Sequence, residues 1–166
     1  MALIQMEDRI MVGTYDESIP GYTWTLPSRL GEMLGLAEEW YGGRDRNYTI
    51  LGFEFVEDSQ CLYYLGDDIY KQILIHLPAY AVTDYDQCLY MAAHESIHCL
   101  SPDRNVQATR LEEGLATNFA NLYMSQIGLG DDWRSTSDDY NEAQQDVEDL
   151  LNLDRDIIRK TSGRQI

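Results

Sequence analysis

Cysteine, histidine and positive charge are all scarce in this chain, and each scarcity limits what the protein can be. Three cysteines in 166 residues are too few for a disulfide framework, and their odd number fits a reducing compartment better. Only 12 lysine and arginine residues stand against 29 aspartate and glutamate residues, which gives a net charge of −17. Because such a charge repels phosphate backbones, we expect no nucleic-acid partner. The charge attracts basic peptides, although an acidic surface that keeps the protein in solution explains it more simply.

Long apolar runs are missing as well. No stretch reaches the roughly 20 apolar residues that a membrane-spanning helix requires, so we expect no membrane partner. Residues 1–9 carry charges where a signal peptide has its apolar segment. Together with the few cysteines, these features predict a cytoplasmic protein. The length and the hydrophobic content of 44% predict one domain over residues 1–166.

The spacing of apolar residues predicts four helices, one before and three after a β-rich region. The first helix carries an apolar stripe and stops at Gly42-Gly43. The second is apolar nearly all round, which is typical of a helix inside a domain. The last has acidic residues in its first turn and basic residues near its end, which suits the helix dipole. The predicted helices cover residues 27–41, 84–100, 110–124 and 137–160.

Three β-rich runs lie between the first and second helices, at residues 48–56, 61–65 and 72–77. Alternation in the first run predicts that Leu51, Phe53 and Phe55 share one face. The polar turns between the runs predict hairpin connections in an antiparallel or mixed sheet. The order of helix, sheet and helices is an α+β plan, with a small sheet packed on the first two helices and further helices at the C-terminus.

Two of the three histidines lie in one pentapeptide of the second helix, His94-Glu95-Ser96-Ile97-His98. Positions four apart share a helix face, so both imidazoles can reach one metal ion. The glutamate beside the first histidine is placed to act as a general base. Buried histidines and a buried carboxylate need partners, because an unpaired charge in an apolar interior is costly. The pattern therefore predicts half of a zinc site together with a catalytic group.

Two histidines leave a catalytic zinc ion one protein ligand short, since such sites use three ligands and keep the fourth position for water. The pattern with a third histidine downstream is excluded, because its positions hold Arg104 and Ala108. The remaining histidine, His76, lies upstream of the motif. A carboxylate is therefore the expected third ligand.

The segment Leu111-Glu112-Glu113-Gly114-Leu115-Ala116-Thr117 begins the third predicted helix. Together with the pentapeptide, it resembles the gluzincin group of zinc metallopeptidases over residues 72–124. In that group a second helix supplies a glutamate that is often followed by glycine. The resemblance implies a zincin-like fold, one Zn²⁺ per chain held by His94, His98 and Glu113, and hydrolysis of peptide bonds. The spacing between His98 and Glu113 is somewhat shorter than in the best-known members.

The residues themselves favour Glu113 over Glu112 as the ligand. The helix face through Glu113 continues with small side chains at Ala116, Thr117 and Ala120, which let two helices approach around an ion. The face through Glu112 carries large apolar residues that are typical of a core. A pair of solvated carboxylates at the start of a helix is a third interpretation.

The resemblance also implies groups around the substrate. A hydrogen-bond donor to the oxyanion is expected from a downstream element, and Tyr123 and Tyr140 are candidates, although both are also typical core or surface aromatics. A strand before the motif helix would form the rim of the cleft, which places Leu74 and His76 near substrate. Thr117 is placed either to support a histidine ligand or to bond its own helix backbone.

Three hypotheses about function follow from these patterns. The first is a zinc-dependent peptidase in which Glu95 acts as general base on a peptide or protein substrate. The second is a peptidase-like domain that keeps its zinc but acts as a regulatory or partner-binding module, although such a domain has no use for Glu95. The third is a chance motif without a metal. The sequence does not distinguish an endopeptidase from an aminopeptidase.

Overall fold

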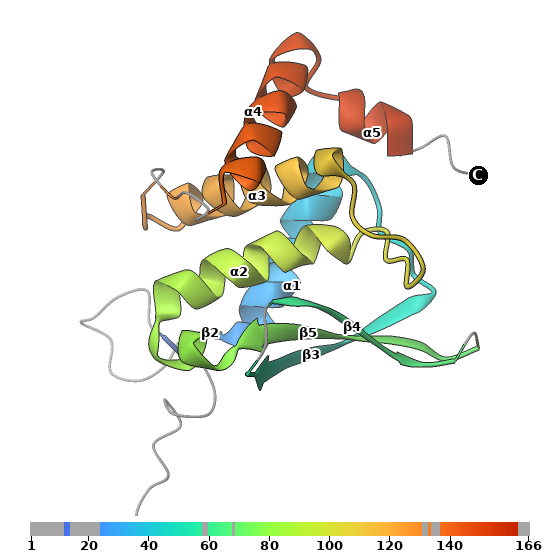
Figure 1. Cartoon of the computed structure of the whole chain (residues 1–166), viewed down its shortest axis with the longest axis vertical. Helices are drawn as coiled ribbons and strands as arrows, with labels where there is room; N and C mark the ends of the chain where they lie inside the picture. The colour runs from blue at the N-terminus through green and yellow to red at the C-terminus, as the bar shows by residue number, and fades with distance from the viewer. Residues whose placement is uncertain are drawn as a thin grey trace, which may run out of the picture.

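The computed structural model describes residues 12–13, 24–57, 60–67, 69–130, 133 and 137–162. A small sheet forms one layer, α1 and α2 lie against it, and α3, α4 and α5 lie beyond α2 (Figure 1). This mixture of helices with a small mixed sheet is consistent with the predicted α+β plan. No helix in the described ranges is long and apolar enough to cross a membrane.

Helix α1 (Leu26–Tyr41) begins and ends where the sequence predicts, to within one residue. Thr25 and Ser28 form a capping box, in which each side chain accepts a hydrogen bond from the backbone N–H of the other. The helix ends at Gly42, whose φ of 118° favours glycine. Before it, a short antiparallel pair joins β1 (Val12–Gly13) to β2 (Trp24–Thr25).

The sheet contains β3 (Tyr48–Val56), β4 (Cys61–Gly66) and β5 (Lys71–Pro78), in the order β3-β5-β4. The three predicted runs are confirmed, and so is the mixed sheet, because β5 is parallel to β3 and antiparallel to β4. The predicted hairpin between the first two runs is wrong, since β5 lies between β3 and β4. The hairpin between β4 and β5 is confirmed.

Strand β3 also corrects the prediction that Leu51, Phe53 and Phe55 share a face. The pairing with β5 shifts between Ile50 and Gly52, so Leu51 is the extra residue of a bulge. Leu51 is 48% exposed, whereas Ile50, Phe53 and Phe55 pack against the core. The positive φ of Gly52, 128°, is part of this bulge.

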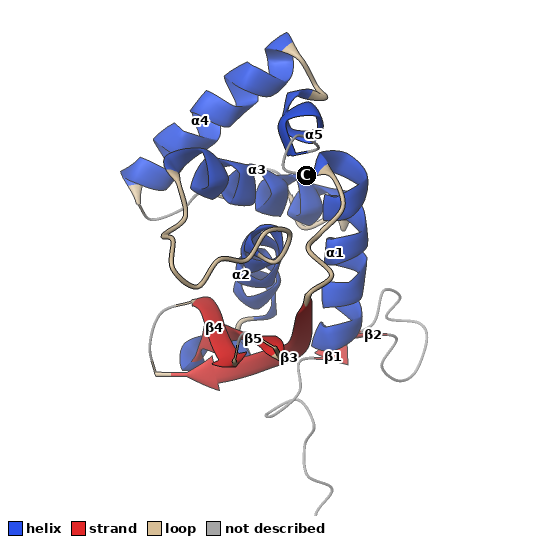
Figure 2. Cartoon of the chain, turned by 90° about the vertical axis from the view of Figure 1, so that its right-hand side faces the viewer, coloured by secondary structure: helices blue, strands red, loops and turns tan. Residues whose placement is uncertain are grey.

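Helix α2 (Tyr85–His98) follows the short 3₁₀ helix η2 (Ala79–Thr83) and lies between the sheet and α3 (Figure 2). Asp84 caps it by accepting a hydrogen bond from the backbone N–H of Gln87. All residues from 91 to 97 are buried, which confirms the prediction of a helix inside the domain. The helix ends at His98, two residues earlier than predicted.

The C-terminal part consists of α3 (Arg110–Gln126), α4 (Asp138–Leu153) and α5 (Ile157–Ser162). The predicted single helix over residues 137–160 is wrong, because Asp154 has an extended backbone that separates α4 from α5. The Asp154 carboxylate accepts hydrogen bonds from the Asp156 backbone N–H and from the Lys160 ammonium. These bonds stabilise the break where the sequence contains neither glycine nor proline.

Gly114 lets α4 approach the start of α3 closely. A Cβ atom at Gly114 would lie 2.1 Å from the carbonyl oxygen of Ala143 in α4 and 2.9 Å from a methyl carbon of Val147. Because Gly114 has no side chain, α4, which contains Tyr140, can pack directly beside Glu113. This packing gives a physical reason for a glycine at that position.

We expect Gly114→Ala to destabilise the protein by about 1–3 kcal/mol, because the added methyl group overlaps the α4 backbone. Gly35→Ala is the matched control, since a Cβ atom at that helical position meets nothing within 4 Å. The control should gain up to about 1 kcal/mol. Urea unfolding measures both changes. Equal stability of the two variants would contradict the close contact between α3 and α4.

Candidate metal centre

Three side chains from two helices converge at the centre of the domain. Helix α2 presents His94 and His98 from one face, and the first turn of α3 presents Glu113. Glu113 Oε2 lies 3.2 Å from His94 Nε2 and 3.6 Å from His98 Nε2. The two Nε2 atoms are 3.4 Å apart. The structure thus brings together the three ligands that the sequence analysis expects.

These separations fit a zinc ion. Ligand atoms at the corners of a tetrahedron with metal bonds of ~2.0–2.1 Å lie roughly 3.3 Å from one another. The three donor atoms all lie within 4.8 Å of one another, and two imidazoles with one carboxylate form a donor set that zinc accepts. A metal ion would fit between them with only small movements of the side chains.

The neighbouring carboxylates Glu112 and Glu113 make different contacts with the two histidines. Glu112 Oε1 lies 2.8 Å from His98 Nδ1, which donates the hydrogen bond. This contact leaves His98 Nε2 directed toward Glu113 and fixes the orientation of the ring. The sequence analysis weighed Glu112 only as a competing ligand or a solvated carboxylate. Consecutive helix positions point about 100° apart, so that neighbouring carboxylates can reach the two sides of one imidazole.

The charges at the site support one another. Burial raises the pKa of Glu113, but hydrogen bonds and attraction from His94 and His98 lower it by more. The resulting pKa is about 2. Burial lowers the pKa of His98, but its hydrogen bonds to Glu112 and Glu113 raise it to about 10. Without a metal ion, a positive imidazolium therefore occupies the place between the carboxylates. A divalent cation would replace that positive charge.

Glu95 lies beside this cluster but is not one of its ligands. The residue is 3% exposed, and burial raises the pKa of its carboxyl group against the opposing effect of His94 and His98. The side-chain amide of Gln60, directly before β4, donates a hydrogen bond to it. Sequence analysis missed Gln60, because no local pattern links a residue before an edge strand to a helix more than 30 positions away.

A cavity of about 540 Å³ opens onto these residues. One wall is the edge strand β4, through Leu62 and Tyr64, and the opposite wall is the loop of residues 101–108 that joins α2 to α3. Tyr140 from α4 also lines the cavity, with its ring centroid 5.9 Å from that of His94. Of the two tyrosine candidates, Tyr140 is therefore the one at the site.

Tyr123 lies elsewhere. Its side chain is fully buried, and its hydroxyl lies 3.4 Å both from Arg29 Nη1 and from Glu32 Oε2 of α1. It does not line the cavity beside His94. Thr117 donates its hydroxyl hydrogen bond to the backbone oxygen of Glu113, so the second of its two predicted roles is confirmed.

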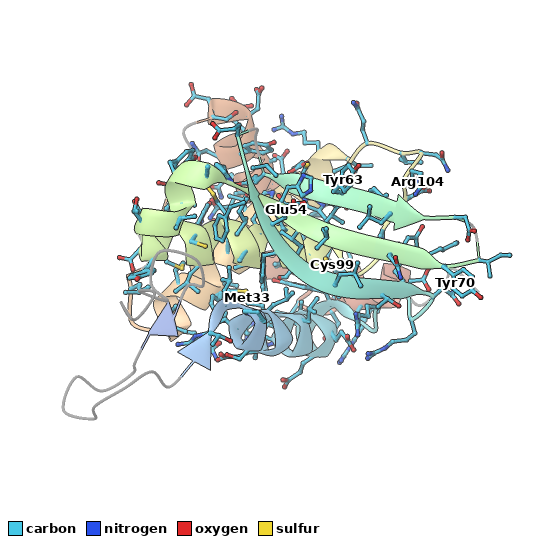
Figure 3. All side chains as sticks on the ribbon, turned by 90° about the horizontal axis from the view of Figure 1, so that it is seen from below. Met33, Glu54, Tyr63, Tyr70, Cys99 and Arg104 are labelled. Atoms are coloured by element: carbon cyan, nitrogen blue, oxygen red, sulfur yellow. The ribbon has the colours of Figure 1, made fainter. Side chains whose placement is uncertain are left out.

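The expectation that Leu74 and His76 lie at the rim of the cleft is wrong. Both belong to β5, which is the central strand and is paired on both sides. His76 stacks on Tyr63 at 4.6 Å and lies 3.3 Å from Glu54, and Figure 3 labels these two neighbours on the sheet. The rim of the cavity is β4, which precedes β5 in sequence but lies outside it in the sheet.

Comparison of the chain with family models, with curated proteins and with solved structures finds no match in any of the three. The function is therefore inferred from the geometry and chemistry of the site.

The raised pKa of His98 predicts how the metal-free protein responds to pH. The folded value of about 10 lies above the unfolded value of ~6.5. The contribution to stability is therefore complete below pH ~6.5 and is lost as the pH rises through about 10. Urea unfolding with chelator should show that the stability advantage of the wild type over His98→Gln shrinks across this window. An advantage that stays constant with pH would contradict the pairing of His98 with the two glutamates.

Proposed function

We propose that the protein is a zinc-dependent peptidase of gluzincin type with a zincin-like fold. The observation that carries the proposal is the placement of Glu95. Three protein donors at zinc-compatible separations leave the fourth position of a tetrahedral zinc ion for water. Hydrolysis also requires a general base, and Glu95 is a buried carboxylate beside these donors that faces the same cavity and is not a ligand.

Each residue then has a distinct task. His94, His98 and Glu113 hold one zinc ion per chain, and Glu112 holds the His98 ring in the ligating orientation. When bound, zinc makes water more acidic and polarises the scissile carbonyl group. Glu95 takes the proton from the attacking water and delivers it to the leaving amine. Gln60 keeps the Glu95 carboxylate in place through its hydrogen bond.

Tyr140 is suited to stabilise the negative charge that develops on the carbonyl oxygen. Burial, together with repulsion from Glu113 and Glu95, raises the pKa of its phenol. The hydroxyl therefore keeps its proton at neutral pH and can donate a hydrogen bond. The close packing of α4 on Gly114 places this tyrosine above His94.

Substitution of Glu95 tests the proposal most simply. Glu95→Gln should keep one zinc per chain and lose peptide hydrolysis by roughly 10²–10⁴-fold, because the amide cannot accept the proton. Glu57→Gln is the matched control, since Glu57 is exposed and does not line the cavity. Zinc content by elemental analysis and cleavage of a broad peptide library measure the two effects. Equal cleavage by Glu95→Gln and wild type would refute the role of Glu95.

Substitutions of the adjacent glutamates separate ligand from support. Glu113→Ala should lose much of both zinc and activity, whereas Glu112→Ala should weaken zinc binding by about 10–100-fold. Zinc bound by the wild type without cleavage of any library peptide would favour a regulatory, partner-binding module instead. No zinc bound in chelator-free buffer would exclude both functions.

A further inference from the structure

The cavity beside the metal centre is closed at one end by contacts between the 101–108 loop and β4. The backbone N–H of Asp103 donates a hydrogen bond to the Tyr64 hydroxyl. One residue further along the loop, Arg104 Nη2 lies 3.3 Å from the carbonyl oxygen of Gly66. Figure 3 shows Arg104 on the loop beside the end of β4. These contacts join the two walls of the cavity.

A second, smaller cavity lies beyond this closure. Its volume is about 300 Å³, and Leu65, Asp67 and Lys71 line it but do not line the cavity at the metal centre. Tyr64 and residues 102–104 line both cavities. They therefore form a common wall, and the cavity at the metal centre does not continue along β4 past Tyr64.

The opposite end of the cavity is the end at which the leaving group departs. Glu95 delivers the proton to the leaving nitrogen. Its carboxylate accepts a hydrogen bond from Gln60, which lies directly before β4. The substrate segment on the C-terminal side of the scissile bond must therefore extend past Gln60. The segment on the N-terminal side must extend toward Tyr64 and the common wall.

The length of β4 sets how much chain fits on that side. Gln60 and Tyr64 are four positions apart, with three residues between them, which corresponds to ~13 Å at ~3.3 Å per residue of an extended chain. Within the described residues β4 is an edge strand that pairs with β5, and an extended peptide can lie along its outer side. Such a peptide reaches the wall within about three residues of the reacting carbonyl.

We infer that the cleft accepts no more than about three residues on the N-terminal side of the scissile bond, so that the protein trims peptides from their N-terminus instead of cutting within a chain. The inference rests on the proposed function and adds the class of substrate to it. Neither the metal centre nor Glu95 would by itself distinguish these two activities. The difference lies in the contacts of Tyr64 and Arg104 that close the cavity.

The test is to map the first cuts that the zinc-loaded full chain makes in a library of twelve-residue peptides, by mass spectrometry at early times. We expect products that have lost one to three N-terminal residues. Cuts with six or more residues on the N-terminal side should be at least tenfold slower. Internal cuts at equal rates would overturn the inference while leaving the proposed peptidase intact. No cut at any position, with zinc bound, would overturn the proposed function itself.

Substitutions in the wall between the two cavities test directly whether this wall limits the substrate. Tyr64→Phe combined with Arg104→Ala removes both contacts between the loop and β4, and should raise the ratio of internal to terminal cuts several-fold. Arg46→Ala is the matched control, because it removes an exposed guanidinium that does not line either cavity. An unchanged ratio in the double variant, with zinc content and unfolding midpoint preserved, would show that this wall does not limit the substrate.

Discussion

The contact between the end of α2 and the first turn of α3 is the interaction on which the rest of the site depends. Helix α2 is buried between the sheet and α3, so its polar side chains can find partners in few places. Thr109 caps α3 and thereby sets the turn that carries Glu112 and Glu113. Those two carboxylates approach His98 from its two sides, and Glu113 also reaches His94. Small buried residues along α3, such as Ala116 and Ala120, permit the close approach.

This contact is hard to explain by stability alone. Burying ionisable groups costs free energy, and well-packed apolar residues of similar size are often at least as stable. Glu95 is a clear case, since burial raises the pKa of its carboxyl group. A strongly perturbed group in a cavity is typical of a functional site. The same buried surroundings would strengthen the electrostatic effects that the proposed hydrolysis uses.

Local patterns predicted most of the elements, and non-local pairing explains where prediction failed. Apolar periodicity located α1, α2 and all three long strands, because burial on one side leaves a clear signal. Turn residues did not reveal that β5 lies between β3 and β4, since strand order depends on contacts across the sheet. The bulge at Leu51 and the break at Asp154 depend on backbone conformation and local hydrogen bonds. The two histidines were evident because they are four positions apart. Gln60 reaches Glu95, and Tyr64 meets the 101–108 loop, only after the chain has folded. Local sequence patterns therefore could not predict either contact.

In the proposed function His94, His98 and Glu113 bind one zinc ion and leave a position open for water. X-ray absorption spectroscopy at the zinc edge of the zinc-loaded full chain identifies the ligands of that ion. We expect scattering from two imidazoles at ~2.0–2.1 Å together with oxygen ligands at ~2.0–2.2 Å, and one imidazole fewer in His98→Gln. A sulfur scatterer at ~2.3 Å, or an oxygen shell without imidazole scattering, would contradict it.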